Sequence, residues 1–269
     1  MIAFLSRTLP LLLAVLLLGS GGARAAEVTV MSSGGFYSAL EELGPVFEKQ
    51  SGHKVVLVSG SSMGSSPTSI PARLQRGEPA DLVVLVGTEL DRLIAEKLAL
   101  AGSKVDLAQS RIGMAVRAGA PRPDIRTREA FERTLLEARS IGYSGSASGK
   151  HLVNEVFPKL GSDEYRRLVD KSKLAVNEPV AAMVARGDVE IGFQQVSEML
   201  TAPGVDFVGA IPDAYQKVTV FSAGLAPQAK HLEAAKALIR FLTSPAAYPL
   251  IEKQGLEPAS RATETAPKK

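Results

Sequence analysis

The sequence has 269 residues, of which 45% are hydrophobic and 22% are charged. This length and composition predict one large folded domain or two smaller ones, and they exclude a disordered or fibrous chain. Cysteine is absent, which excludes disulfides, thiolate metal sites and a cysteine nucleophile.

Residues 1–25 have the features of a cleavable secretory signal peptide. Arg7 precedes a short leucine-rich run, and Ala23-Arg24-Ala25 forms an A-x-A cleavage site. A membrane anchor is the alternative, but the apolar run is too short to span a bilayer. Cleavage removes two arginines and no acid, so the formal net charge of +3 falls close to neutral and leaves no basic patch for nucleic acid. We therefore expect export to the periplasm of a Gram-negative bacterium.

The first part of the remaining chain alternates short apolar runs with amphipathic stretches. This pattern predicts strands at 28–31, 54–58 and 81–86 and helices at 36–50, 70–76 and 89–96. The resulting β-α-β-α-β order predicts a parallel sheet with right-handed crossovers.

The second part begins with a predicted strand at 111–117 and continues the alternation. It predicts strands at 140–143, 189–193, 205–208 and 218–223 and helices at 127–138, 150–160, 179–186, 232–242 and 246–254. The strands at 111–117 and 218–223 are the expected connections between two α/β units. The polar segment 259–269 is expected to be a disordered tail.

Loops of serine and glycine follow three of the predicted strands, and each loop precedes a predicted helix. They are Ser32–Gly35, Gly60–Ser66 and Ser144–Gly149. Open α/β sheets bind ligands at the carboxyl ends of their strands, and helix N-termini favour anions because their backbone N–H groups are free. Serine hydroxyls add donors, and glycine lets a ligand approach the backbone. The loops therefore predict an anion site, although serine and glycine are also ordinary helix caps.

Other kinds of site find little support in the sequence. Gly149-Lys150 looks like the end of a phosphate-binding loop, but the first glycine of that motif would fall on Ser144 and its Ser/Thr on His151. Three scattered histidines give no metal-ligand spacing, and no G-x-S-x-G motif marks an acyl-transfer serine. We expect neither a metal nor a cofactor.

Several short strings, in this order and spacing, resemble the periplasmic molybdate-binding proteins, which are solute receptors of ABC importers. The strings are Gly60–Ser62, Gly77–Leu82, Ser148–Lys150, Val184–Asp188, Ala234–Ala237 and Phe241–Pro245, and the resemblance covers about residues 27–257. It implies an α/β, type II periplasmic-binding-protein fold with two lobes, each a mostly parallel sheet flanked by helices. Lobe I would comprise 26–109 and 222–258, and lobe II 110–221, joined by hinge strands.

The resemblance also implies a ligand site made of neutral donors: serine hydroxyls, backbone N–H groups and a tyrosine hydroxyl. Gln195 falls where the family has its tyrosine, the second loop carries additional residues, and the third loop is more polar. These departures predict a larger pocket than a compact oxyanion needs, so the ligand is an organic carboxylate or, as the family implies, molybdate or tungstate. The expected ligand-binding residues are Ser33, Gly34, Ser61, Ser62, Ser146, Ser148, Asn177 and Gln195.

An aconitate isomerase is known on a scaffold similar to the molybdate-binding proteins, which makes an enzyme the alternative to a receptor. Moving a double bond along a tricarboxylate requires a base and donors that stabilise the developing negative charge. The candidate catalytic residues are His151, Lys150 and Glu178. His151 is alternatively a solvated first-turn residue, Lys150 a point-charge partner of a substrate carboxylate, and Glu178 an acid favoured by the helix dipole.

The sequence thus predicts a periplasmic substrate-binding protein that closes on a small anion for an ABC-type importer. We expect it to act as a monomer. The alternative is a periplasmic aconitate isomerase that interconverts cis- and trans-aconitate on the same scaffold. Both functions require the same anion-binding loops.

Overall fold

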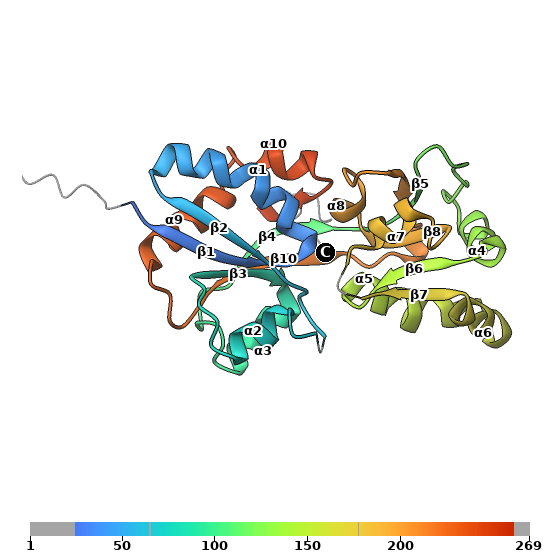
Figure 1. The fold of residues 1–269 in the computed structure, drawn as a ribbon, viewed down its shortest axis with the longest axis horizontal. Helices are drawn as coiled ribbons and strands as arrows, with labels where there is room; N and C mark the ends of the chain where they lie inside the picture. The colour runs from blue at the N-terminus through green and yellow to red at the C-terminus, as the bar shows by residue number, and fades with distance from the viewer. Residues whose placement is uncertain (1–24, 65, 177, 261–269) are drawn as a thin grey trace, which may run out of the picture.

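The computed structural model describes residues 25–64, 66–176 and 178–260, which form two lobes side by side (Figure 1). Each lobe contains one β-sheet with helices on both faces, so the predicted two-lobe α/β fold is confirmed. The predicted signal peptide, except for Ala25, lies outside the described residues. Asn177 and most of the predicted tail also lie outside them. Within the described ranges, every helix is too short or too polar to span a bilayer.

The sheet of lobe I has six strands in the order β11-β4-β10-β3-β1-β2. β1 is parallel to β2 and β3, as the β-α-β pattern predicts, whereas β10 runs antiparallel between β3 and β4. The sheet is mixed because β10 returns to lobe I after the chain has passed through lobe II. Its strands are β1 (Glu27–Ser32), β2 (Lys54–Ser59), β3 (Leu82–Val86), β4 (Val105–Ser110), β10 (Thr219–Leu225) and β11 (Glu257–Pro258).

Helices cover both faces of this sheet, and the side chains of β3 show why. Leu82 and Val84 point into the core beneath α1, α9 and α10, while Val83 and Leu85 point into the core beneath α2 and α3. A strand that is buried on both faces has a continuous apolar sequence. The helices are α1 (Gly34–Ser51), α2 (Ile70–Gln75), α3 (Gly87–Ala95), α9 (Leu232–Leu242) and α10 (Tyr248–Lys253).

The sheet of lobe II has the order β7-β6-β8-β5-β9 and is also mixed. β6 is parallel to β7 and β8, while β5 is antiparallel to β8 and β9. One core lies beneath α4, α6 and the helical segment after α5, and the other lies beneath α7 and α8. The strands are β5 (Ile112–Arg117), β6 (Ile141–Ser144), β7 (Ser172–Ala175), β8 (Ile191–Gln195) and β9 (Val205–Ala210), and the helices are α4 (Arg128–Glu137), α5 (Ala147–His151), α6 (Ser162–Asp170), α7 (Val180–Arg186) and α8 (Val196–Met199).

Five of these strands and helices, β4, β7, β11, α6 and α8, are not predicted by the sequence patterns. α6 buries only Leu168, and β7 buries only Ala175. Such elements lack the apolar periodicity on which a prediction from sequence depends. A further difference is the segment predicted as one helix at 150–160, where α5 begins earlier and continues as a π-helix over Leu152–Val156 and a 3-10 helix over Phe157–Leu160.

The chain crosses between the lobes at Arg111 and again along residues 211–218. The side chain of Gln216 clamps the two crossings together, since Ile112 N donates to its Oε1 (2.7 Å) and its Nε2 donates to Ile112 O (3.0 Å). The backbone N–H of Val196 also donates to the carbonyl of Arg111 (2.8 Å). Two crossings held side by side form the kind of narrow connection about which lobes rotate.

Candidate functional site

The carboxyl ends of the parallel strands in lobe I bring the first two serine–glycine loops together. Gly60 N, after β2, donates to Ser32 O at the end of β1 (3.0 Å). Ser62 Oγ accepts a hydrogen bond from Val86 N (3.1 Å), which ties the second loop to the end of β3. Parallel strands end at one edge of a sheet, and ligands bind beside that edge in open α/β sheets.

Ser33 stands immediately before α1, and the residue is buried, with 3% of its surface exposed. Its Oγ has no hydrogen-bond partner among the described residues. The N–H groups of Gly34 and Gly35 open α1, where helix N–H groups lack an i−4 acceptor, whereas Phe36 N already donates to Ser33 O (3.1 Å). Ser61 differs, because it donates its hydroxyl to Met63 O within its own loop (2.8 Å). An unpaired hydroxyl beside free helix N–H groups is suited to hold an anion.

The third loop lies at the end of β6 in lobe II, and α5 begins within it at Ala147. The hydroxyls of Ser146 and Ser148 lie 3.0 and 3.2 Å from Ser144 Oγ. Gly149 packs so closely on this loop that a Cβ there would overlap the carbonyl of Ser144, which explains the glycine. Because hydroxyl hydrogens rotate, this compact cluster can turn its donors toward a ligand.

Gln195 ends β8 and is buried at the border between the lobes. Its Nε2 donates to Thr219 Oγ1 at the start of β10 (3.0 Å), and its Oε1 has no partner in the described part of the chain. Turning the amide by 180° lets Thr219 donate to Oε1 and places Nε2 in the unpaired position. Gln195 therefore links the lobes and can present a donor, as the tyrosine of the molybdate-binding family would.

A cavity of about 310 Å³ lies between the lobes beside these groups. Lobe I supplies the second loop, β3 and α3, and lobe II supplies α5 and the π-helix. The end of the crossing segment and the start of β10 form the remaining wall. Because Val86 bonds Ser62 and Thr219 bonds Gln195, the cavity adjoins residues predicted to bind the ligand. The lining residues are Met63, Val86, Thr88, Ala147, Lys150, His151, Asn154, Glu155, Lys217, Val218, Thr219 and Val220.

Two of the predicted catalytic residues line this cavity. Lys150 is exposed at its wall, whereas His151 is buried. His151 Nε2 lies 2.8 Å from Tyr215 O and must donate to it, since a carbonyl only accepts. His151 Nδ1 lies 3.1 Å from a carboxylate oxygen of Glu155, and Glu155 also pairs with Lys217 (2.9 Å). The imidazole is thus held within a charged cluster.

The third predicted catalytic residue, Glu178, is paired elsewhere in lobe II. Its two carboxylate oxygens accept hydrogen bonds from Arg186, at 2.8 and 3.1 Å. These bonds lower the pKa of Glu178. A carboxylate stabilised in its ionised form is a weak base, so this geometry does not favour proton transfer by Glu178. The neighbouring Asn177 lies outside the described residues.

Glu198 on α8 lies where the two lobes meet, and the sequence patterns do not single it out. A Cβ on Gly34, in the first turn of α1, would overlap Glu198 Oε1, so the carboxyl of one lobe contacts the helix N-terminus of the other. Gln194 Nε2 donates to the same oxygen (2.6 Å). Burial raises the pKa of Glu198 to about 7, an effect larger than the lowering by the Gln194 bond and by the backbone N–H of Gln195.

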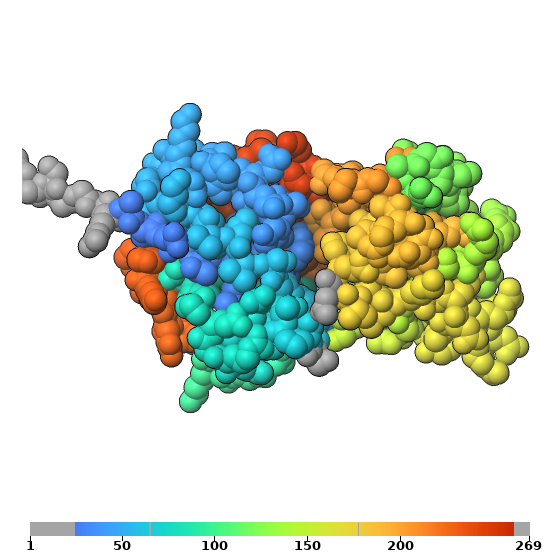
Figure 2. All heavy atoms as spheres, in the orientation of Figure 1, coloured from blue at the N-terminus to red at the C-terminus, as the bar shows by residue number. Residues whose placement is uncertain are grey.

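The contact around Glu198 belongs to a wider docking of α8 on α1. Ser197 Oγ donates to Gly35 O (2.7 Å), and Ser38 Oγ donates to Ser197 O (3.4 Å). The ends of α1 and α8 lie next to each other in Figure 1, and atoms of the two lobes meet there in Figure 2. Lobe II therefore reaches the first serine–glycine loop of lobe I through α8.

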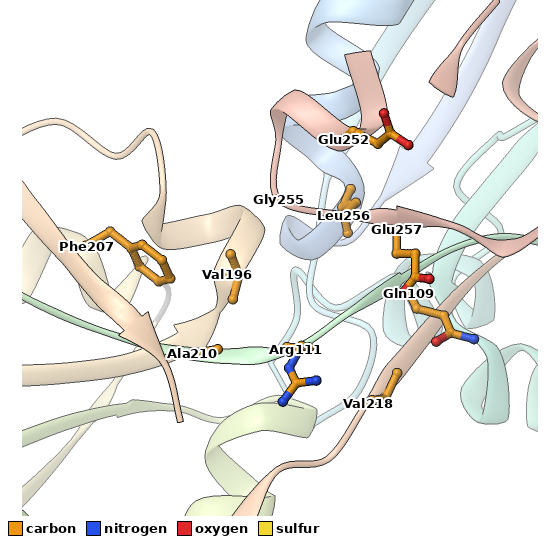
Figure 3. A pocket seen from close by; sticks show the side chains of 10 residues that line it. All are labelled: Gln109, Arg111, Val196, Phe207, Ala210, Val218, Glu252, Gly255, Leu256 and Glu257. Atoms are coloured by element: carbon orange, nitrogen blue, oxygen red, sulfur yellow. The ribbon is translucent and has the colours of Figure 1, made fainter. Parts of the chain in front are cut away.

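A second cavity, of about 330 Å³, lies against the crossing strands (Figure 3). Arg111 contributes a guanidinium that pairs with Asp213, and Glu252 and Glu257 contribute carboxylates. The described residues of the three serine–glycine loops do not line it, so it is separate from the predicted anion site. Across the described ranges, no group of three or more His, Asp or Glu residues could hold a metal ion.

The chain matches a protein family over both lobes. The family model for bacterial extracellular solute-binding proteins matches residues 28–257. The chain belongs to this family. As a solved structure with the same fold, the sulfate-binding protein SubI from Mycobacterium tuberculosis H37Rv superposes on this solute-binding protein with a TM-score of 0.70 and 20% identity, covering 88% of each chain.

Two relatives of this solute-binding protein match it over nearly its full length. An aconitate isomerase from Pseudomonas sp. is 45% identical over 252 residues, which cover 92% of this chain and 95% of the relative. The molybdate-binding protein ModA from Azotobacter vinelandii is 27% identical over 253 residues, which cover 90% of this chain and 95% of the relative. The predicted resemblance to the molybdate-binding type is therefore confirmed.

Proposed function

We propose that this solute-binding protein is a periplasmic isomerase that interconverts cis- and trans-aconitate. The observation that carries the proposal is the 45% identity to an aconitate isomerase over 92% of the chain. A match of this length includes both lobes and the loops between which the cavity lies. The family description and the predicted signal peptide at 1–25 support the periplasmic location.

The polar groups of the cleft support a carboxylate ligand. The buried Ser33 Oγ and the Gln195 amide leave hydrogen-bonding capacity unused among the described residues. Lys150 adds a positive charge at the cavity wall, where it can pair with a carboxylate. A volume of about 310 Å³ lies within the range of small-molecule sites. These features suit a small polycarboxylate with several separate charges.

The second candidate function is a receptor that delivers a small anion to an ABC importer, and the family fold favours it. The same donors would then hold an organic carboxylate or an oxyanion such as molybdate. For either function we propose that the protein acts as a monomer. The proposed partners are a small anion and, for the receptor, the membrane component of the importer.

Incubation of the purified protein with trans-aconitate, followed by proton NMR, separates the two functions. We expect cis-aconitate to form at a rate proportional to the protein concentration. Molybdate is added as a competitor, and binding of both anions is measured by calorimetry. Binding of either anion without conversion of aconitate would replace the isomerase with the receptor.

A further inference from the structure

We propose that the carboxyl group of Glu198 is the base that removes and returns the proton during the isomerisation. This inference rests on the proposed function and deepens it, because it names a catalytic residue that neither the sequence motifs nor the related proteins' names assign. Three observations carry it: the position of the carboxyl, its orientation by hydrogen bonds, and its negative charge, which would oppose binding in a site that only holds anions.

The carboxyl stands where the two lobes meet. Glu198 belongs to α8 of lobe II, and its Oε1 occupies the space that a Cβ on Gly34 would need. Gly34 opens α1 in lobe I, directly after the buried Ser33 whose hydroxyl has no partner in the described residues. A ligand that bonds Ser33 and the first turn of α1 therefore lies next to Glu198. The Glu198 residue as a whole is half-buried at this meeting point.

The orientation of the carboxyl is set by a chain of hydrogen bonds. Val180 N, at the start of α7, donates to Gln194 Oε1 (2.9 Å). This bond fixes which end of the amide is the donor, and Gln194 Nε2 then donates to Glu198 Oε1 (2.6 Å). The backbone N–H of Gln195 also stabilises the ionised carboxylate. A carboxylate has more acceptor sites than these bonds use, so it can still accept a proton.

The charge of Glu198 is unfavourable in a simple anion receptor. An ionised carboxylate at the N-terminus of α1 competes with an anionic ligand for the positive end of the helix dipole, and it also repels that ligand. Catalysis gives the group a use, because an isomerase needs a base whose pKa lies near the working pH. The raised pKa of about 7 meets that requirement. On α1, the titratable groups of the first two turns are Tyr37 and Glu41, and neither is among the causes of this shift.

The other candidate bases are held in less suitable ways. Glu178 is bound by Arg186, and His151 donates through Nε2 to Tyr215 O while its Nδ1 faces Glu155. Lys150 is better suited to pair with a substrate carboxylate than to remove a proton from carbon. Glu198, in contrast, contacts the first loop and has a raised pKa.

The proposed step is a proton shift across three carbons of aconitate. Glu198 takes a proton from the methylene carbon, which is acidified by its carboxyl group and by the adjacent alkene. The released electron pair forms a double bond to the central carbon, and the pair of the old double bond moves to the former alkene CH. Glu198 returns the proton to that carbon, so atoms and electrons balance without a co-reactant. The donors at Ser33 and α1 stabilise the negative charge between the two transfers.

The test compares wild-type protein with Glu198→Gln, Glu198→Asp and the control Glu137→Gln, which changes an exposed glutamate on α4 of the same lobe. We expect Glu198→Gln to lower kcat by about 10²- to 10⁴-fold. Calorimetric binding of trans-aconitate should persist or strengthen, because a negative charge is removed. Proton exchange with deuterated solvent at the substrate methylene should disappear with the activity. Glu137→Gln should match the wild type.

The pH profile adds a readout that a structural role would not affect. Wild-type kcat/KM should rise with pH to a plateau with an apparent pKa close to that of Glu198, and Glu198→Asp should keep reduced activity with this limb displaced. Full activity and solvent exchange in Glu198→Gln would overturn the assignment while the isomerase function stands. Loss of aconitate binding together with activity would also overturn it, since Glu198 would then be a binding group. A wild-type protein that binds but does not isomerise would instead end the proposed function.

Discussion

Ser33 and Ser62 occupy neighbouring loops but use their hydroxyls in opposite ways. Ser33 Oγ is buried without a partner among the described residues, whereas Ser62 Oγ accepts a hydrogen bond from Val86 N. Because Ser33 has its hydroxyl free for a ligand, Ser33→Ala should leave the free energy of unfolding unchanged or slightly higher. It should weaken aconitate binding by about 10- to 100-fold, the worth of a hydrogen bond to a charged group, about 1.5–3 kcal/mol. Calorimetry and urea denaturation measure the two effects.

Ser62→Ala is the matched control for this prediction. It leaves the N–H of Val86 without its acceptor inside the protein, so the free energy of unfolding should fall by about 1–3 kcal/mol. The pair of variants therefore separates a hydroxyl held for a ligand from one that supports the fold. Wild-type affinity in Ser33→Ala would show that the start of α1 does not hold the anion.

Glu198 should make the stability of the protein depend on pH. Its pKa in the folded protein is raised from 4.5 to about 7, so the folded state binds this proton more tightly than the unfolded state. The resulting stabilisation is fully present below the unfolded pKa and is lost as the pH rises through the folded value. The free energy of unfolding of wild type, relative to Glu198→Gln, should fall by up to about 3 kcal/mol over this window. Denaturation series of both proteins at pH 4.5 and pH 8 test this prediction. An equal difference in the free energy of unfolding between wild type and Glu198→Gln at the two pH values would contradict it.

At the scale of elements, the docking of α8 on α1 depends on a glycine at the first helical position. The backbone of Gly34 is not left-handed, so α1 itself tolerates alanine, but the new Cβ would overlap Glu198 Oε1. Gly34→Ala should therefore displace the carboxyl and lower kcat by about tenfold or more, since small misplacements of catalytic groups strongly reduce rates. Steady-state kinetics with a thermal melt tests whether activity falls while the fold persists.

Gly44→Ala on the same helix is the control for this displacement. A Cβ there meets Val55 at an ordinary contact distance of 3.8 Å, and alanine is the better helix former. This variant should keep its activity and gain up to about 1 kcal/mol of stability. Equal activity of both glycine variants would mean that the position of the Glu198 carboxyl does not limit the reaction.

Elements with strong periodicity are the ones that the sequence predicts. β3 is buried on both faces and α9 has a broad apolar face, so both stand out from their neighbours. β7 and α6 each bury a single residue and carry no such signal. The mixed character of the sheets also escapes sequence patterns, because the direction of β10 depends on the path of the chain through lobe II.

The same distinction applies to the candidate site. Ser33 and Ser62 are candidates because they follow strands, and the carboxyl end of a strand is a recurring ligand position. Gln195 is a candidate through the resemblance to the molybdate-binding proteins. Glu198 is not a candidate from sequence, because its place depends on a contact between lobes rather than on its own sequence neighbours. The ion pair between Glu178 and Arg186 is likewise not predictable from sequence, because it depends on how α7 places Arg186, its last residue, beside Glu178.

At the scale of the whole molecule, a ligand in the cleft should couple the two lobes. The cavity has walls from both lobes, and the clamped crossings leave a narrow connection about which they can move. Aconitate at about 100 times its dissociation constant should add about 2.7 kcal/mol of stability. We expect this to raise the melting temperature by several degrees, measured by calorimetry.

Hydrogen exchange shows whether that stabilisation comes from closure. Aconitate should slow amide exchange together in the start of α1 (lobe I) and in α5 and α8 (lobe II), because a ligand held between the loops restrains both lobes at once. α4 serves as an internal reference, since none of its residues lines the cavity. Ser33→Ala at equal saturation should show the same pattern, because only its affinity is reduced. Protection confined to one lobe would place the ligand on a single lobe and contradict a site formed between the two.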